Sequence, residues 1–238
     1  MKFLRPALKI LALLIWTIIA VFLPQFFFSF LFSLFLDSSS ASPLLTAIYS
    51  ALTYSTSLAL LIFVPWRFFK KWRTSREELG LTGLPTFVDL GLAPIGFAAY
   101  YLLAMLLTSL FELFPWFNLT EPQDVGFDYL FSTTERVIAF VALVLIAPVA
   151  EELIFRGWLY GKLRAKLPKK LSVFLSILLV SLLFAFLHGQ WNVGINVFAM
   201  SVVLCLMREI TGTIYSGIAL HILKNGLAFF LVYILNVS

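Results

Sequence analysis

The amino-acid sequence predicts an all-α protein, a polytopic bundle of about seven transmembrane helices with its N-terminus in the cytoplasm. Three observations lead to this fold class: 61% of the 238 residues are apolar, only 12% are charged, and the mean hydropathy is +1.00. Soluble domains average about 25% charged residues. Because one span needs about 20 apolar residues, the chain is long enough for seven spans with short loops. We expect a single transmembrane domain over residues 1–238.

The first third of the chain is expected to hold three spans. The basic start MKFLRPALK precedes an apolar run, Ile10–Leu36, which is about twice as long as the apolar region of a signal peptide. We therefore interpret it as an uncleaved first span, kinked at Pro24. The second and third spans are Pro43–Val64 and Phe87–Phe114. The basic loop between them, residues 65–86, carries Trp and Phe residues that suit the headgroup region.

The rest of the chain predicts four more spans. After the loop Pro115–Thr134, a fourth span begins near Glu135, and its helix is expected to extend beyond the bilayer to about Lys166. The last three spans are expected at Leu171–His188, Asn192–Met207 and Ile214–Leu235. Cys205, the single cysteine, lies in an apolar run and is interpreted as a small buried hydrophobe. Asn118-Leu-Thr120, in the loop before span four, is a glycosylation sequon if the source is eukaryotic.

The distribution of Lys and Arg orients the spans. With the N-terminus in the cytoplasm, 14 of the 17 basic residues fall on the cytoplasmic side, only Arg136 falls outside, and Arg156 and Lys224 lie within spans. Basic residues mark cytoplasmic loops, so the net charge of +5 reflects topology and not a nucleic-acid partner. We expect a multi-pass protein of the plasma (cytoplasmic) membrane, surrounded by lipid and without nucleic acid.

Three ionisable residues within the fourth span call for an explanation. Glu151, Glu152 and Arg156 lie in the run APVAEELIFRGW, and each costs about 2.5–3.5 kcal/mol at bilayer depth. Glu152 and Arg156 are four residues apart with the acid first, the favourable order for an ion pair on one helix face. Glu151 is rotated by roughly 100° and has no such neighbour. It is left free for chemistry or for a partner from another helix.

Both histidines of the chain are expected inside spans at comparable depth. His188 closes the fifth span, and His221 shares a face of the seventh with Asn225. A rise of ~1.5 Å per residue places Glu151, His188 and His221 roughly 16, 26 and 18 Å from the cytoplasmic ends of their spans. A lone intramembrane histidine is often only an interhelical hydrogen-bonding residue. The joint pattern nevertheless permits one cluster near the middle of the membrane.

These residues form three motifs that resemble those of a known family. The motifs are Glu151-Glu152-x-x-x-Arg156, Phe184-x-x-x-His188 and His221-x-x-x-Asn225. In order and spacing they are similar to the motifs of the CPBP intramembrane proteases, the CAAX-protease and bacteriocin-processing family, also called Abi. The run Arg208–His221 is similar to the family's approach to its last motif. The resemblance covers about residues 75–230 and is most specific over 148–225.

The resemblance implies an endopeptidase that cleaves near the C-terminus of a prenylated, lipidated or otherwise membrane-associated peptide or protein. By resemblance, water would be activated by Glu151 and His188, the oxyanion would be stabilised by His221 and Asn225, and the site would be supported by Glu152 and Arg156. General chemistry agrees, since hydrolysis needs a base for water and donors for the oxyanion. The chain has no G-x-S-x-G motif for a serine nucleophile.

Metal dependence stays open at the level of the sequence. Glu151, His188 and His221 could ligate Zn²⁺ and leave a position for water. The chain lacks H-E-x-x-H, and the two adjacent glutamates point in different directions. We therefore expect a glutamate-type protease without a cofactor, with zinc as the alternative.

Three further residues are candidates for lining the cavity. Lys224 lies well inside span seven and is expected to pair with a carboxylate, or alternatively to meet a carboxylate of the substrate. Asn192, with Asn196, begins span six and could line the same cavity, although capping or interhelical bonding is the default interpretation. Phe184 is more readily explained by packing.

Two other function classes fit the same composition. A non-catalytic membrane scaffold or bacteriocin-immunity protein would use the fold for binding only. A proton-coupled transporter would use intramembrane Glu and His residues as an ion pathway, but the sequence shows no repeated halves of the kind many transporters have.

Overall fold

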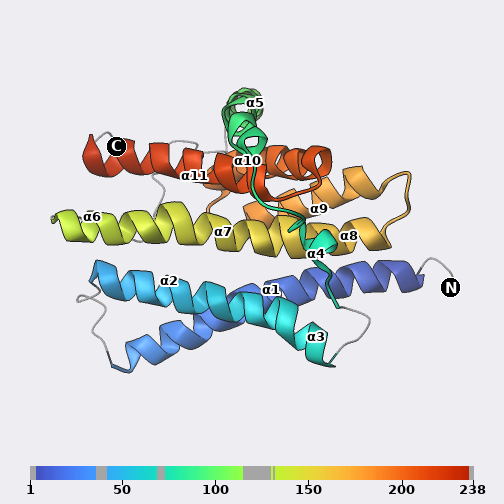
Figure 1. The fold of residues 1–238 in the computed structure, drawn as a ribbon, viewed down its shortest axis with the longest axis horizontal. Coiled ribbons are helices and arrows are strands. Elements are labelled where there is room, and N and C mark those ends of the chain that lie inside the picture. Colours follow the sequence, from blue (N-terminus) through green and yellow to red (C-terminus); the bar gives the residue numbers. More distant parts are fainter. Residues whose placement is uncertain (1–3, 36–41, 69–72, 115–129, 131, 236–238) are drawn as a thin grey trace.

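The computed structural model describes residues 4–35, 42–68, 73–114, 130 and 132–235. All regular structure in these ranges is helical (Figure 1). The elements are α1 (Leu4–Ser33), α2 (Pro43–Leu58), η2 (Ala59–Phe63), α3 (Val64–Phe68), α4 (Arg76–Leu79), α5 (Phe87–Phe111), α6 (Thr133–Phe140), η4 (Val141–Ile146), α7 (Ala147–Glu152), η5 (Leu153–Leu159), α8 (Tyr160–Lys166), α9 (Ser172–Phe186), α10 (Trp191–Thr211), α11 (Tyr215–Phe229) and η6 (Phe230–Ile234), where η marks π-helical turns.

The predicted all-α transmembrane bundle is confirmed for the described residues. Six helices are long and apolar enough to cross a membrane, and α9, at 15 residues, is shorter than a full span. The first helix runs from Leu4 to Ser33 and continues through Pro24. The fifth span was predicted to end at His188, but α9 ends at Phe186 and His188 lies in the turn beyond it. The orientation of the N-terminus stays a prediction, and the sequon Asn118–Thr120 lies outside the described residues.

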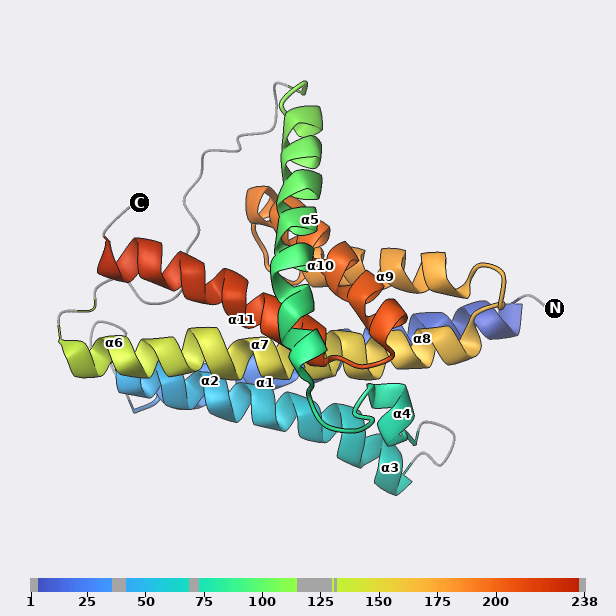
Figure 2. The ribbon, with the colours of Figure 1, turned by 45° about the horizontal axis from the view of Figure 1, so that its top comes forward.

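One long rod organises the bundle. The segments α6, η4, α7, η5 and α8 follow one another without a break over residues 133–166, and we call them the central helix. The pair α1 and α2 lies along one side of it, and α9, α10 and α11 lie along the other (Figure 1). Figure 2 shows α5 crossing α10 and α11 on the outside of this second layer. The central helix therefore touches both layers.

Local sequence signals set the starts of three helices. Before α4, α5 and α6, a Ser or Thr side chain accepts from the backbone N–H three residues on, and the acidic residue there accepts from the cap's own N–H. The pairs are Ser75 with Glu78, Thr86 with Asp89, and Ser132 with Glu135. Such reciprocal capping satisfies two N–H groups that a helix start otherwise leaves unpaired. The start of the central helix is thus encoded at Ser132.

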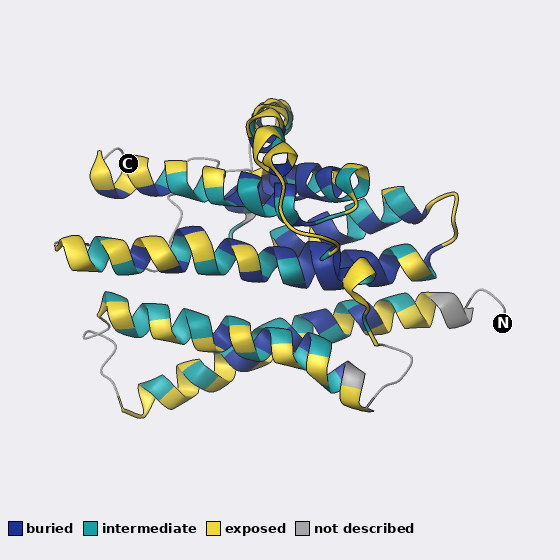
Figure 3. Cartoon of the chain, viewed as in Figure 1, coloured by how far each residue is buried: buried dark blue, intermediate teal, exposed yellow. Residues whose placement is uncertain are grey.

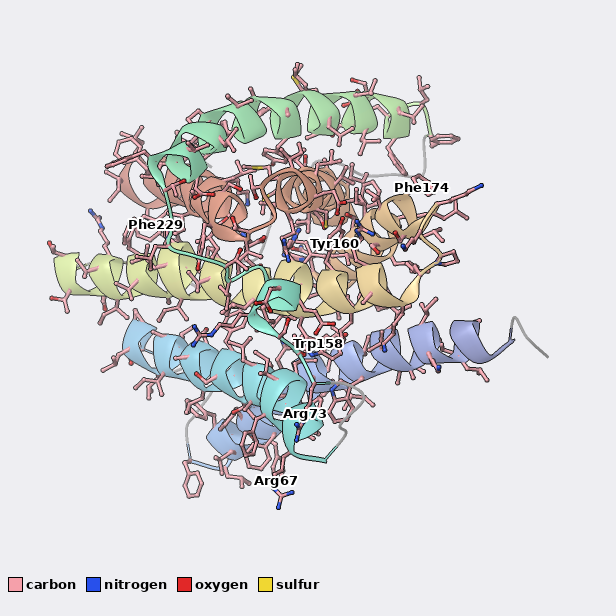
Figure 4. The ribbon with its side chains drawn as sticks, turned by 45° about the vertical axis from the view of Figure 1, so that its right-hand side comes forward. Arg67, Arg73, Trp158, Tyr160, Phe174 and Phe229 are labelled. Atoms are coloured by element: carbon pink, nitrogen blue, oxygen red, sulfur yellow. The ribbon has the colours of Figure 1, made fainter. Side chains whose placement is uncertain are left out.

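The buried residues of the bundle lie mainly along the central helix. Figure 3 shows the buried residues concentrated on the middle of the central helix and on the helices around it. Trp158 and Leu159 are fully buried in a cluster that also contains Leu13 and Val180. In Figure 4, Trp158 points toward the N-terminal helices, whereas Tyr160 points toward the opposite layer. Large apolar side chains are exposed on the outer faces, as expected for surfaces that face lipid.

The short helix α4 is fixed against the central helix through two glycines. Added Cβ atoms at Gly157 and Gly161 would meet the backbone carbonyls of Leu79 and Glu78. Small residues four apart allow this close approach. Lys162 of the same turn donates to the Glu78 carboxylate at 2.8 Å. The segment before α5 is thereby held at this end of the central helix.

Candidate active site

The adjacent carboxylates of α7 have different surroundings. Glu152 is fully buried, and its Oε1 accepts from Arg156 Nη1 at 3.0 Å. This is the ion pair that the spacing predicts. The guanidinium also lies 4.4 Å from the centre of the Phe184 ring on α9, a cation–π contact. Glu152 and Arg156 thus stabilise each other inside the bundle, where an unpaired charge would be costly.

His221 joins α11 to both carboxylates. Its Nδ1 lies 3.1 Å from Oε1 of Glu152, and its Nε2 lies 3.7 Å from Oε2 of Glu151. Because a carboxylate only accepts, Nδ1 carries the proton in the first contact. The second distance is too long for a hydrogen bond, and the contact is an ion pair only when the His221 ring carries both protons. Gly217, one turn earlier, permits the approach, since a Cβ there would meet Glu152 Oε2 at 3.0 Å.

Glu151 has a partner from the N-terminal layer. The Tyr54 hydroxyl of α2 donates to Glu151 Oε1 at 2.6 Å, across 97 residues of sequence. The Glu151 side chain keeps 17% of its surface exposed, in contrast to its neighbour. Sequence reasoning missed Tyr54. A tyrosine in a span carries a polar tip that needs a partner when buried, but nothing local indicates that the partner is Glu151.

His188 lines the same cavity as Glu151. Its Nδ1 lies 2.8 Å from the carbonyl oxygen of Phe184 and, since a carbonyl only accepts, carries the proton. In the neutral ring Nε2 is then left with a free lone pair. A cavity of about 200 Å³ is lined by Glu151, His188 and Tyr54, together with Gln25, Thr53 and Ser57. Water takes about 30 Å³ in the liquid, so this polar space has room for it.

A larger apolar hollow adjoins this cavity. It measures about 820 Å³ and is lined mainly by apolar residues of α5, α9 and α10, including Leu107, Leu182 and Phe198. His188 and Leu187 belong to both hollows. The segment that follows α9 is therefore a shared wall between a polar cavity and an apolar one.

Of the remaining candidates, Phe184 lines the cavity of Glu151 and His188, and Asn225, Lys224 and Asn192 do not. The Asn225 amide donates to the carbonyl of Leu143 in η4 at 3.0 Å, which leaves one N–H of that amide for another acceptor. Lys224 and Asn192 line a third cavity, between α5, α10 and α11. Within the described residues, Lys224 has no carboxylate at ion-pair distance, so the expected pairing is wrong. Phe184 is buried between Phe155 and His188 and lines the cavity of Glu151.

The alternative zinc set does not fit this arrangement. Among the described residues, no group of three or more His, Cys, Asp or Glu side chains is disposed to hold a metal ion. Both nitrogens of His221 face carboxylates, one at hydrogen-bond distance, whereas the Nδ1 contact of His188 with a backbone carbonyl leaves its Nε2 for a ligand. The chemistry below is therefore derived from protein groups alone.

A second polar network ties the central helix to α10. Arg164 contacts both carboxylate oxygens of Glu209, at 2.7 and 2.9 Å, and Tyr160 donates to the same carboxylate at 2.7 Å. Arg164 also donates to Ser172 at the start of α9. Three helices are joined there, toward the end of the central helix that follows the carboxylate pair.

Comparison with known proteins agrees with the three motifs. Residues 133–227 match the family described as type II CAAX prenyl endopeptidase Rce1-like. The chain matches no curated protein and no solved structure. The matched segment contains Glu151, Glu152, Arg156, His188, His221 and Asn225, whereas Tyr54 lies outside it. Residues 133–227 are therefore similar to the Rce1-like family, which is consistent with the CPBP motifs, and six apolar helices long enough to span a membrane indicate an integral membrane protein.

Proposed function

We propose that this protein is an intramembrane endopeptidase that hydrolyses a peptide bond near the C-terminus of a lipidated or membrane-associated peptide or protein. The similarity of residues 133–227 to the Rce1-like family supports a CAAX-type endopeptidase acting on a peptide in a lipid environment. The observation that carries the residue-level proposal is the shared cavity of Glu151 and His188. We place the protein in the plasma (cytoplasmic) membrane.

The proposed reaction uses water bound between these two side chains. Glu151, with His188 Nε2 as its partner, takes a proton from the water as its oxygen attacks the scissile carbonyl carbon. The carbonyl oxygen becomes an oxyanion, for which we assign two donors, the free N–H of Asn225 and the Nε2–H of His221 in its doubly protonated form, since the Nδ1–H already donates to Glu152. Return of the proton to the leaving nitrogen breaks the C–N bond and releases a new carboxylate and a new amine.

The linings of the two hollows suit a substrate that consists of a peptide and an attached lipid chain. A prenyl or acyl chain suits the apolar hollow, whose walls are hydrocarbon and aromatic. A peptide bond next to the lipidated residue would then come close to His188, which lines both spaces. This arrangement provides positioning as well as chemistry.

The decisive experiment is cleavage by the purified full chain. A prenylated C-terminal peptide is incubated with wild-type, Glu151→Ala and His188→Ala proteins, and the products are identified by mass spectrometry. We expect each variant to cleave the peptide about 10²–10⁴-fold or more slowly than the wild type. Both variants should still insert into the membrane. Glu112→Ala, an exposed carboxylate at the end of α5, is the matched control and should keep full turnover.

The same reactions run with a chelator address the cofactor. Unchanged wild-type turnover is expected for a glutamate-type protease, and loss that zinc restores would establish the metal alternative. Retained turnover in Glu151→Ala would refute the catalytic assignment.

A further inference from the structure

Lys224 is a cation in the middle of a transmembrane helix, and no carboxylate of the described residues lies at ion-pair distance from it. It is the tenth of the 20 residues of the span Tyr215–Ile234. Its side chain lines the cavity between α5, α10 and α11, and no ion pair joins it to a carboxylate of the described residues. Ionisable groups at this depth normally pair with one another or face a functional cavity. The position therefore points to an anion that comes from outside the chain.

The cavity around Lys224 has polar side chains beside apolar ones in its wall. It measures about 560 Å³, and hydroxyl and amide side chains of α5 and α10 contribute to its wall. These are Tyr100, Thr108, Ser109, Asn192 and Asn196. Hydroxyls and amides donate hydrogen bonds to anionic oxygens, and an ammonium supplies the charge. This combination suits a carboxylate.

The cavity lies within a short peptide's reach of the reacting groups. Lys224 follows His221 by three residues of α11, a rise of about 4.5 Å. An extended peptide spans roughly 3.3–3.6 Å per residue. A leaving peptide of a few residues could therefore join the scissile bond to Lys224.

On this basis, and resting on the function proposed above, we propose that the Lys224 cavity binds the free C-terminal carboxylate of the peptide substrate. The chain would then recognise its substrate at two points, the lipidated residue in the apolar hollow and the terminal carboxylate at Lys224. The carboxylate contact fixes how far the scissile bond lies from the end of the substrate. Only peptides that end a few residues after the lipidated residue would satisfy both contacts.

The test compares two peptides that differ only at the C-terminus, one a free acid and the other a carboxamide. In the wild type we expect KM to be about tenfold to hundredfold lower for the acid, the range for a hydrogen-bonded charge. Lys224→Met should abolish this preference by raising KM for the acid alone, and Lys224→Arg should restore part of it. Lys170→Met, which removes an exposed lysine from the loop before α9, should leave the preference unchanged.

A binding measurement separates this proposal from the proposed hydrolysis. Fluorescence polarisation with the two labelled peptides is run on the Glu151→Gln protein, with and without Lys224→Met. Selective binding of the acid without cleavage by the wild type would overturn the hydrolase and keep the carboxylate site. Equal Kd values for acid and amide, or a preference that survives Lys224→Met, would overturn the carboxylate site. Native mass spectra showing Lys224-dependent retention of phosphatidylglycerol, with equal peptide affinities, would assign the cavity to a lipid phosphate instead.

Discussion

Tyr54 and Glu151 lie 97 residues apart in sequence and 2.6 Å apart in space, hydroxyl to carboxylate. The contact links α2 to the central helix at the carboxylate that we assign as the base. A donor of this kind fixes the rotamer of a carboxylate that is otherwise partly exposed to the cavity. The layer formed by α1 and α2 therefore contributes to the candidate active site and does more than cover it.

Tyr54→Phe should lower kcat by about tenfold with little change in KM. A hydrogen bond to a charged group contributes about 1.5–3 kcal/mol, and only part of this energy holds the Glu151 carboxylate in its orientation. The measurement is steady-state cleavage of the prenylated peptide. The matched control is Tyr49→Phe on the same helix. It removes a hydroxyl that donates to the backbone carbonyl of Gln25 at 3.2 Å. Equal losses in both variants would assign the effect to packing of α2.

Glu152→Gln should reduce thermal stability strongly, because it leaves Arg156 as an uncompensated buried cation. Breaking a buried pair costs about 3–5 kcal/mol. The matched variant is Glu209→Gln, whose carboxylate pairs with Arg164 but is 30% exposed, so that its loss should cost about 1 kcal/mol or less. Melting of the two proteins in the same detergent checks this. Similar melting temperatures for Glu152→Gln and the wild type would argue against a buried charge pair.

Gly161→Ala should detach α4 from the central helix, because the new methyl group would overlap the Glu78 carbonyl oxygen. Overpacking of this kind costs about 1–3 kcal/mol. Gly91→Ala is the control, since a Cβ at this exposed helical position meets nothing within 4 Å and should be neutral or stabilising. Thermal unfolding of both variants measures the difference. A Gly161→Ala protein as stable as Gly91→Ala would show that the contact is not close in solution.

The cytoplasmic N-terminus predicts opposite labelling of two new cysteines. Lys170→Cys, in the loop before α9, should react with an impermeant maleimide only in inside-out vesicles. Glu112→Cys, at the end of α5, should react in intact cells. Both positions are exposed, and the native Cys205 is fully buried and should stay silent. The reverse pattern would invert the topology.

The sequence could predict the features that depend on residues close together in the chain. The pairing of Glu152 with Arg156 depends on a spacing within one helix, and the start of the central helix depends on the Ser132 cap. The end of α9 was misjudged, although a local signal exists. Gly189, directly after His188, adopts φ +73°, a conformation that commonly ends helices. That turn places the His188 ring beyond the last helical residue.

The contacts between layers could not be predicted. Tyr54 meets Glu151 only because α2 packs along the central helix, and hydropathy gives no information about which spans are neighbours. The same holds for Lys224, for which pairing with a carboxylate was the favoured expectation. The cavity that surrounds it forms between three helices whose order around the bundle is not written in their composition.

The shared wall at Leu187 and His188 has a practical consequence for handling the protein. Any hydrocarbon tail that fills the apolar hollow, including that of a solubilising detergent or a co-purified phospholipid, occupies the space next to the histidine. Such tails would act as competitive inhibitors of a lipidated substrate, with a potency that depends on their length. The detergent or lipid chosen for purification is therefore expected to change the measured cleavage rate.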